Sequence, residues 1–143
     1  MLLIDATVLL RAHRLDAPSH NAFRHWLERV VESDAPFSVP DLVLTDFVRI
    51  VTNPRIFTPP TPLEVALAAA DALRDQPTHV PLATGPRHFA IFSRLCREAG
   101  AYGPLAADAR LAALAIETGS ELATTDRGFR RFSGLRVVHP LAD

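Results

Sequence analysis

Short apolar runs alternate with longer amphipathic segments along this chain of 143 residues. The runs have the length of a buried strand, and the segments between them repeat their apolar positions every three or four residues, as a helix packed on one face does. The predicted strands are 2–5, 35–39, 79–83, 121–124 and 135–138. Pro81 confines the third of them to a sheet edge or a strand end. The alternation predicts an α/β fold, with a parallel sheet covered by helices on both faces.

Apolar periodicity and end signals predict the helices between these strands. Ser38 with Asp41, and Thr61 with Glu64, have capping-box spacing and indicate two helix starts. Gly100 is placed to end a helix. The segment after the first strand predicts a turn. The predicted helices cover 18–33, 38–53, 61–74, 85–100 and 107–118.

The composition is typical of a soluble globular protein, with 48% apolar and 22% charged residues. No apolar run approaches the roughly 18 residues that a bilayer requires, so no membrane segment is expected. The N-terminus has an acid at position 5 and no basic segment ahead of its apolar stretch, unlike a secretory signal. We therefore expect a single domain over 1–143, located in the cytoplasm.

The net charge of −1 excludes nucleic-acid binding through overall charge, so any contact with RNA or DNA requires a local patch. All 15 basic residues are arginine, which suits bidentate phosphate contacts, although a codon bias explains the same count. The lone Cys96 is interpreted as a core or half-buried residue. The six histidines lack zinc-site spacing and are interpreted as surface or structural residues.

Four aspartates lie among apolar residues, where a carboxylate is costly unless a cation meets it. Asp5 and Asp126 follow predicted strands, which places both at the carboxyl edge of the sheet. Asp46 shares a predicted helix face with core residues, and Asp108 lies near a predicted helix start. Clustered carboxylates suit a hard divalent ion, Mg²⁺ or Mn²⁺. The pattern predicts phosphodiester cleavage by a metal-activated water.

Each aspartate also has a purely structural explanation. Asp5 could cap a helix that follows it, and Asp126 could begin a turn before the next glycine. Asp108 gains from a helix dipole without any chemistry, and Asp46 could face solvent and pair with Arg49. The metal hypothesis therefore depends on the conjunction of all four acids.

Hydroxyl and guanidinium groups flank the aspartates. Thr7 and Thr124 could orient a carboxylate or hold a metal-bound water, and they could equally be ordinary β-branched or capping residues. Arginines near the last two aspartates could bind an RNA phosphate, or could be solvated surface residues. These are Arg110, Arg127, Arg130 and Arg131.

Three segments together resemble the PIN-domain ribonucleases, specifically the VapC toxins of bacterial toxin–antitoxin pairs. They are LLIDATVLL, LTDFVRIVTNPRIF and GPLAADARLAALAIETGSELATTDRGFRRF, which lie along nearly the whole chain. The resemblance implies a three-layer α/β/α PIN-like domain with a short central parallel sheet. It also implies a Mg²⁺-dependent toxin endoribonuclease in the bacterial cytoplasm, a homodimer, and a small VapB-type antitoxin. We expect such an inhibitor to insert a basic side chain into a groove near the acids.

Within this resemblance, Asp5, Asp108 and Asp126 match the acidic positions of the family, and Thr124 matches the hydroxyl residue before the last acid. Two positions depart from the pattern. Asp46 stands where many members carry Glu, and a glycine two residues after Asp126 replaces a further acid. We therefore expect Asp5, Asp108 and Asp126 to ligate the metal and Asp46 to contribute less directly.

Two other functions fit parts of the sequence. A phosphatase of the haloacid dehalogenase type would use Asp5 as its nucleophile, but Thr7 stands where that class has its second acid, and the chain has no lysine. A non-catalytic PIN module would only hold RNA or an antitoxin. A trapped aspartyl-phosphate would favour the first alternative, and metal-independent RNA binding without turnover would favour the second.

Overall fold

Four short parallel strands form the centre of the computed structural model, which describes residues 1–142. The sheet order is β2-β1-β3-β4, and every neighbouring pair is parallel. Because the strands are parallel, their carboxyl ends meet at one edge of the sheet. The strands are β1 (Leu2–Ile4), β2 (Phe37–Ser38), β3 (Glu121–Ala123) and β4 (Arg136–Val138).

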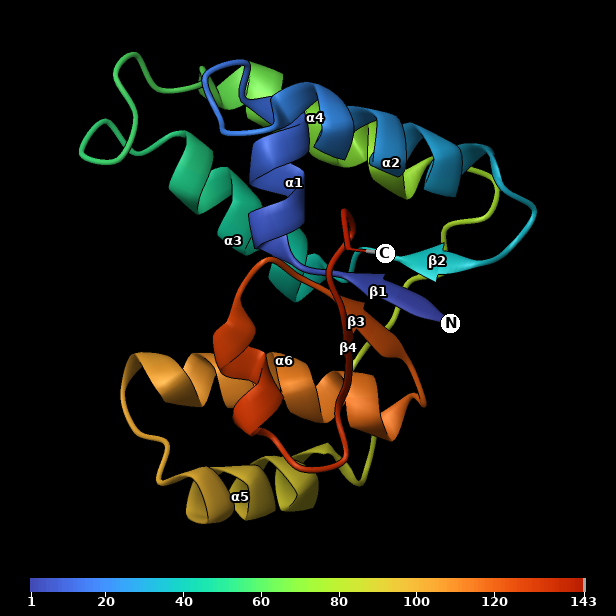
Figure 1. The fold of residues 1–143 in the computed structure, drawn as a ribbon, viewed down its shortest axis with the longest axis vertical. Coiled ribbons are helices and arrows are strands. Elements are labelled where there is room, and N and C mark those ends of the chain that lie inside the picture. The colour runs from blue at the N-terminus through green and yellow to red at the C-terminus, as the bar shows by residue number, and fades with distance from the viewer. Residues whose placement is uncertain (143) are drawn as a thin grey trace.

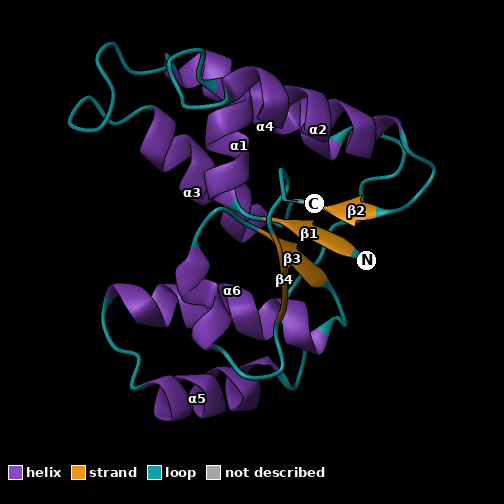
Figure 2. Cartoon of the chain, viewed as in Figure 1, coloured by secondary structure: helices purple, strands orange, loops and turns teal. Residues whose placement is uncertain are grey.

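Helices cover both faces of this sheet (Figures 1 and 2). One layer contains α1 (Ala6–His13), α2 (His20–Glu32), α3 (Asp41–Val51) and α4 (Leu63–Arg74). The opposite layer contains α5 (His88–Ala99) and α6 (Pro104–Glu117), and a 3₁₀ segment, η1 (Arg127–Arg131), joins β3 to β4. The predicted three-layer α/β/α fold is confirmed. Among residues 1–142, no helix has the length and apolar character needed to cross a bilayer.

The helices pack where their apolar residues predict. Along α3, Val43, Phe47 and Val51 are buried and face the core. In α6 the run 111–115 is buried on every side, because this helix lies between the sheet and α5 (Figure 1). A helix that is apolar all round is the kind that a fold encloses completely. Its small alanine side chains allow that close approach.

The strand predicted over 79–83 does not form. His79 makes a single parallel bridge with Phe37, and the Val80 N–H donates to the Phe37 carbonyl at 2.8 Å. Pro81 has no N–H with which to extend this pairing, so the contact ends there. The segment is therefore a one-residue extension of the sheet edge beside β2. The other four predicted strands form within two residues of their expected bounds.

Both predicted capping boxes are wrong. Helix α3 begins after Pro40 without a side-chain cap, and Ser38 lies buried in β2. Helix α4 begins after Pro62, also without a side-chain cap, and Thr61 is buried against His13. In each case a proline with extended backbone takes the position before the first helical turn. The hydroxyl that should have capped the helix lies inside the protein instead.

Two helix starts differ from the prediction in ways that affect the acids. The turn predicted after β1 is helix α1, which begins directly after Asp5. Helix α6 begins at Pro104 rather than near Ala107, so Asp108 lies in its second turn. The field of a helix end falls off within the first turn. The helix dipole therefore does not explain why an acid stands at Asp108.

Candidate active site

Asp5 ends β1 and caps α1 with the same carboxylate. Its Oδ1 accepts a hydrogen bond from the Ala6 N–H at 2.7 Å. Its Oδ2 accepts from the hydroxyls of Thr7 at 2.9 Å and Thr124 at 2.7 Å. The residue is only 7% exposed. Burial raises the pKa of Asp5, the hydrogen bonds from Thr124, Thr7 and Ala6 oppose that rise, and the charge of Asp126 adds to it.

The two threonines connect the carboxyl ends of β1 and β3. Thr124 is buried, and its hydroxyl oxygen accepts a hydrogen bond from the Asp126 N–H at 3.0 Å while donating to Asp5. The Thr7 hydroxyl oxygen accepts from the Thr125 N–H at 3.2 Å. Each hydroxyl therefore both donates to the buried carboxylate and receives a backbone N–H from the turn after β3. This pairing fixes the orientation of the Asp5 side chain.

Asp126 lies at the entrance to η1, where its Oδ1 accepts a hydrogen bond from the Gly128 N–H at 2.8 Å. The turn suggested by the sequence is therefore present. The Asp126 side chain is exposed, in contrast to buried Asp5. It is nevertheless close enough to raise the pKa of both Asp5 and Asp108 through its charge.

Asp108 belongs to α6, in the opposite helix layer, and lies near the other acids. Its pKa is raised to about 6, first by burial and then by the negative charges of Asp126 and Asp5. Arg131 opposes this rise, and Asp46 adds a smaller increase. The charges of the other three predicted acids therefore all act on Asp108, although these acids come from α3, the residue after β1 and the turn after β3. The assignment of these four acids to one metal site stays a prediction.

The expected core-facing position of Asp46 is wrong. Its side chain is 38% exposed and lies 3.5 Å from the guanidinium of Arg49. The buried stripe of α3 passes through its neighbour Phe47 instead. Asp46 therefore stands at the border of that stripe, where the surface ion pair suggested by the sequence is formed.

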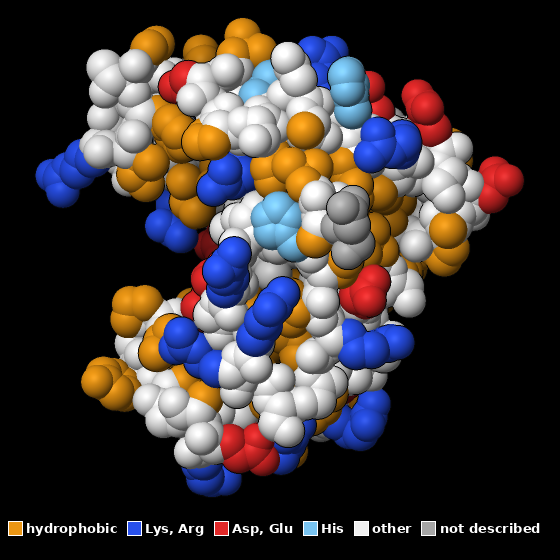
Figure 3. All heavy atoms as spheres, in the orientation of Figure 1, with side chains coloured by type: hydrophobic (Ala, Val, Ile, Leu, Met, Phe, Trp, Pro, Cys, Tyr) orange, Lys and Arg blue, Asp and Glu red, His pale blue; other side chains and the backbone are white. Residues whose placement is uncertain are grey.

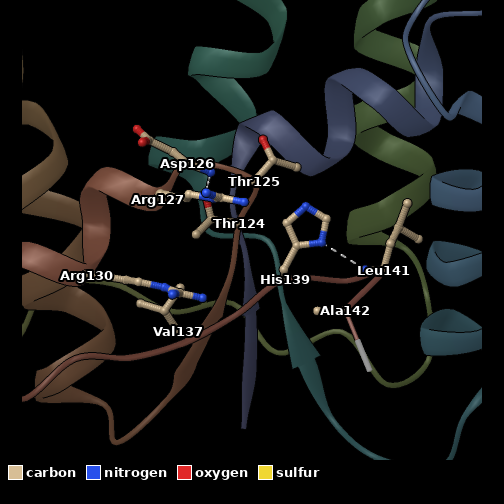
Figure 4. A pocket seen from close by; sticks show the side chains of 9 residues that line it. All are labelled: Thr124, Thr125, Asp126, Arg127, Arg130, Val137, His139, Leu141 and Ala142. Carbon is tan, nitrogen blue, oxygen red and sulfur yellow. Dashed lines mark hydrogen bonds between the residues drawn. The ribbon is translucent and has the colours of Figure 1, made fainter.

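The four arginines near the acids do not form one group. Arg131 is the one whose charge lowers the pKa of Asp108, and its Nε donates to the Gly128 carbonyl at 2.8 Å. Arg110 lies two residues after Asp108, about 200° around the helix, and is exposed on another face of α6. Arg127 and Arg130 line a separate pocket beside the turn after β3 (Figure 4).

The acids lie where the surface is hollowed. Figure 3 shows a notch between the α1 and α3 layer and the α5 and α6 layer, with acidic side chains in its depth and arginines on its rim. Oxygen donors of this kind suit Mg²⁺ or Mn²⁺. Burial is the first cause of the raised pKa of Asp108, and the negative charges of the other acids add to it. Among residues 1–142, however, no three acidic, histidine or cysteine side chains stand close enough to form a ready metal site. The donors therefore suit a hard cation in chemistry and charge, and in this structure Asp5 and Asp126 accept hydrogen bonds from threonine hydroxyls and backbone N–H groups.

His139 was not predicted as a site residue. It follows β4 and lines the pocket of Arg127 and Arg130, beside Thr125 (Figure 4). Its place directly after the last predicted strand could have identified it as a site residue, because the carboxyl end of β4 lies next to that of β3.

Comparison with known proteins finds a family and close relatives that match almost the whole chain. The profile of the PIN domain family matches residues 2–135. Ribonuclease VapC25 from Mycobacterium tuberculosis is 45% identical over 140 residues, which cover 98% of this chain and 99% of that protein. VapC ribonuclease Mb2897 from Mycobacterium bovis is 45% identical over 141 residues, which cover 99% of this chain and 96% of that protein.

Solved structures of lower identity share the fold. The structure of VapBC2 from Rickettsia felis, bound to a DNA fragment from its promoter, aligns with a TM-score of 0.71 at 15% identity, covering 96% of this chain and 97% of that one. VapC20 from Mycobacterium tuberculosis, a toxin that cleaves the sarcin-ricin loop, aligns with a TM-score of 0.66 at 15% identity, covering 95% and 99%. The family is shown by the profile match over residues 2–135 and by the 45% identical relatives. This chain belongs to the PIN-domain family, in its VapC group.

Proposed function

We propose that this protein is the toxin endoribonuclease of a VapBC-type toxin–antitoxin pair and that it cleaves RNA with the help of Mg²⁺ or Mn²⁺. The observation that carries the proposal is the convergence of Asp5, Asp46, Asp108 and Asp126 on one electrostatic environment. In it, burial and neighbouring charge raise the pKa of Asp108 to about 6. The relatives that are 45% identical along almost the full chain are named ribonucleases, which supports the same chemistry.

Asp5, Asp108 and Asp126 are the residues that would hold the ion, with Asp46 at the border of the site. A divalent ion would lower the pKa of a water molecule and offset negative charge on the phosphodiester. The mutual repulsion of the acids favours such a cation, because it lets all of them stay ionised together. The Asp126 carboxylate accepts the Gly128 N–H through Oδ1, and its Oδ2 is the oxygen that would meet the ion.

The remaining residues position the acids. Thr7 and Thr124 hold the Asp5 carboxylate in one orientation through hydroxyl hydrogen bonds of 2.9 and 2.7 Å. Arg131 supplies a positive charge near Asp108, and that charge would attract an RNA phosphate. Loss of a residue that orients a metal ligand typically lowers metal affinity or activity by about 10- to 100-fold.

Cleavage of a mixed pool of structured RNA tests the proposal. The purified protein is incubated with Mg²⁺ or Mn²⁺, beside an EDTA control and an Asp108→Asn variant. We expect cutting that requires the metal and is lost in the variant. If Asp108→Asn and Asp5→Asn both cut as fast as the unchanged protein, the assignment of the acids fails.

The partners follow from the same proposal. Structural neighbours include VapBC complexes, so we propose a small VapB-type antitoxin as the inhibitor of this chain. Its basic side chain is predicted to enter the notch beside the acids, and a complex that leaves all four acids untouched would contradict this form of inhibition. A homodimer and a cytoplasmic location stay predictions from the family resemblance.

The phosphatase alternative loses its main support in this geometry. Its nucleophile would be Asp5, whose two oxygens accept three hydrogen bonds and which is almost completely buried. Thr7, which stands where that class has its second acid, donates its hydroxyl to this carboxylate at 2.9 Å, so no acid is present there to protonate a leaving group. The non-catalytic alternative is tested by the cleavage experiment itself, because RNA binding without cutting in any metal would favour it.

A further inference from the structure

A second hollow lies beside the acids and is not used by the proposed metal site. It has a volume of about 310 Å³, at the lower end of the range of small-molecule sites. We call it the η1 pocket, and its lining includes Thr125, Arg127, Arg130, Val137, His139 and Leu141. Asp126 borders it, but the Asp126 carboxylate points away from the arginines (Figure 4). The η1 pocket and the acid cluster are therefore neighbours that meet at the turn after β3.

The 3₁₀ geometry of η1 divides its arginines between these two places. Residues three apart eclipse one another in a 3₁₀ helix, so Arg127 and Arg130 extend from the same side. Figure 4 shows both side chains reaching into the η1 pocket. Arg131 is one position further and acts on Asp108 instead. The buried ring of Phe129 anchors the segment between them.

His139 presents a hydrogen-bond donor on the opposite wall. Its Nδ1 accepts a hydrogen bond from the Leu141 N–H at 3.1 Å, so the proton of the neutral ring is on Nε2. The ring also packs near the ring of Phe23, with 6.0 Å between the two ring centroids. The Nε2–H and the face of the imidazole are then available to a molecule in the η1 pocket (Figure 4).

No carboxylate in the described part of the chain, residues 1–142, is a counter-ion for the positive groups of the η1 pocket. Among residues 1–142, neither Arg127 nor Arg130 forms an ion pair or a side-chain hydrogen bond with a carboxylate, although five other arginines do form ion pairs. Two guanidinium groups that face one hollow, and that pair with no carboxylate of the described residues, favour an anion, and arginine is well suited to phosphate oxygens. Val137 and Leu141 add apolar surface beside them.

We propose that the η1 pocket binds one nucleotide of the RNA strand next to the cleaved bond. This inference rests on the proposed ribonuclease function. Arg127 and Arg130 contact the phosphate of that nucleotide, and its base packs against the imidazole of His139 and the side chain of Leu141. Unpaired bases that stack on flat side chains are the usual elements of single-stranded RNA recognition. The η1 pocket then sets which nucleotide is accepted beside the site of cleavage.

Nucleotide binding without turnover tests this directly. A fluorescein-labelled, single-stranded RNA pentamer pool and the four nucleoside 5′-monophosphates are titrated into the protein in EDTA. Binding is followed through changes in the chemical shifts of the backbone amides in NMR spectra. We expect the largest shifts between residues 124 and 142 for both probes. The Arg127→Gln/Arg130→Gln double variant should bind the RNA about tenfold or more weakly, because hydrogen bonds to charged groups are lost.

The matched control is Arg97→Gln, which removes an exposed arginine from α5, on the far side of α6 from the sheet. It should bind RNA as the unchanged protein does. Both pocket arginines are exposed, so the double variant should keep its melting temperature. The salt dependence gives a second readout, since each lost phosphate contact on a single strand should lower the slope of log K against log salt by about 0.7.

The outcomes separate this inference from the proposed function. A double variant that binds and cuts RNA as the unchanged protein does would overturn the η1 pocket and leave the nuclease in place. Shifts from the monophosphates but none from the RNA pentamers would also overturn it, because the pocket would then bind a free nucleotide. A protein that cuts no RNA but shows the expected shifts would keep the nucleotide site and contradict the ribonuclease.

Discussion

At the scale of single residues, the Thr124 hydroxyl contacts two of the acidic residues. It donates a hydrogen bond to Asp5 and accepts one from the Asp126 N–H. Thr124→Val keeps the shape and removes both hydrogen bonds. We predict a loss of cleavage rate of about 10- to 100-fold with RNA binding unchanged. Thr124→Ser should recover most of that rate. Rates and affinities measured separately decide the matter, since equal losses in the two variants would indicate packing rather than the hydroxyl.

Asp108 gives a prediction on pH. Its folded pKa of about 6 lies above the ordinary value of 3.8, so the folded state binds more protons between these values and stability falls as pH rises through them. Without metal, Asp108→Asn should therefore raise the melting temperature at pH 7.5, by about 2–4 °C after allowing for solvent screening. The gain should shrink toward zero near pH 4. Thermal melts in EDTA measure it, with the exposed Asp71→Asn as control.

The residues also show what the sequence could predict. Asp5 and Asp126 were placed correctly because each follows an apolar run, and the ends of parallel strands must meet. Asp46 was misplaced because three- and four-residue spacing defines a stripe but not its border. The spacing of arginines could not reveal a 3₁₀ segment, so the separation of Arg131 from Arg127 required the structure.

At the scale of elements, α5 is attached to α6 by a carboxylate clamp. Glu117, the last residue of α6, accepts hydrogen bonds from the N–H groups of Gly85 at 2.7 Å and Arg87 at 2.9 Å. The hydrogen bond from Gly85 is the main cause that lowers the pKa of Glu117. Its contribution to stability is therefore present above the ordinary value of 4.5 and is lost as pH falls through the lower folded pKa.

Glu117→Gln should weaken this clamp, because one amide oxygen replaces two charged acceptors. We predict a melting temperature lower by about 2–4 °C at pH 7 and faster amide exchange at the start of α5. The difference should disappear at a pH where Glu117 is protonated. Glu98→Gln, which removes only the exposed ion pair with Arg94, is the control. An equal loss in both variants would show that general surface charge is responsible.

Gly85→Ala should act like Glu117→Gln, since a Cβ there would lie 2.7 Å from Glu117 Oε2.

At the scale of the whole molecule, the acids come from every layer of the fold. Asp46 belongs to α3, Asp108 to α6 on the opposite face, and Asp5 and Asp126 follow the carboxyl ends of β1 and β3 in the sheet between them. A cation bound by these acids would therefore connect the three layers across the notch of Figure 3. Because an ion that binds only the folded state stabilises it, its binding should be visible in the unfolding of the entire protein.

We predict that Mg²⁺ or Mn²⁺ at about 100 times its Kd raises the stability by about 2.7 kcal/mol. Amide exchange should slow in both α1 and α6, because the ion removes the repulsion that opposes their approach. Asp108→Asn should lose this response while its metal-free form melts at the higher temperature predicted above. The two effects together identify Asp108 as a metal ligand. An acid that is only destabilised by burial and repulsion would raise the metal-free melting temperature when replaced, but the response to metal would remain. A metal response that persists in Asp108→Asn, or protection confined to one layer, would place the ion away from the notch.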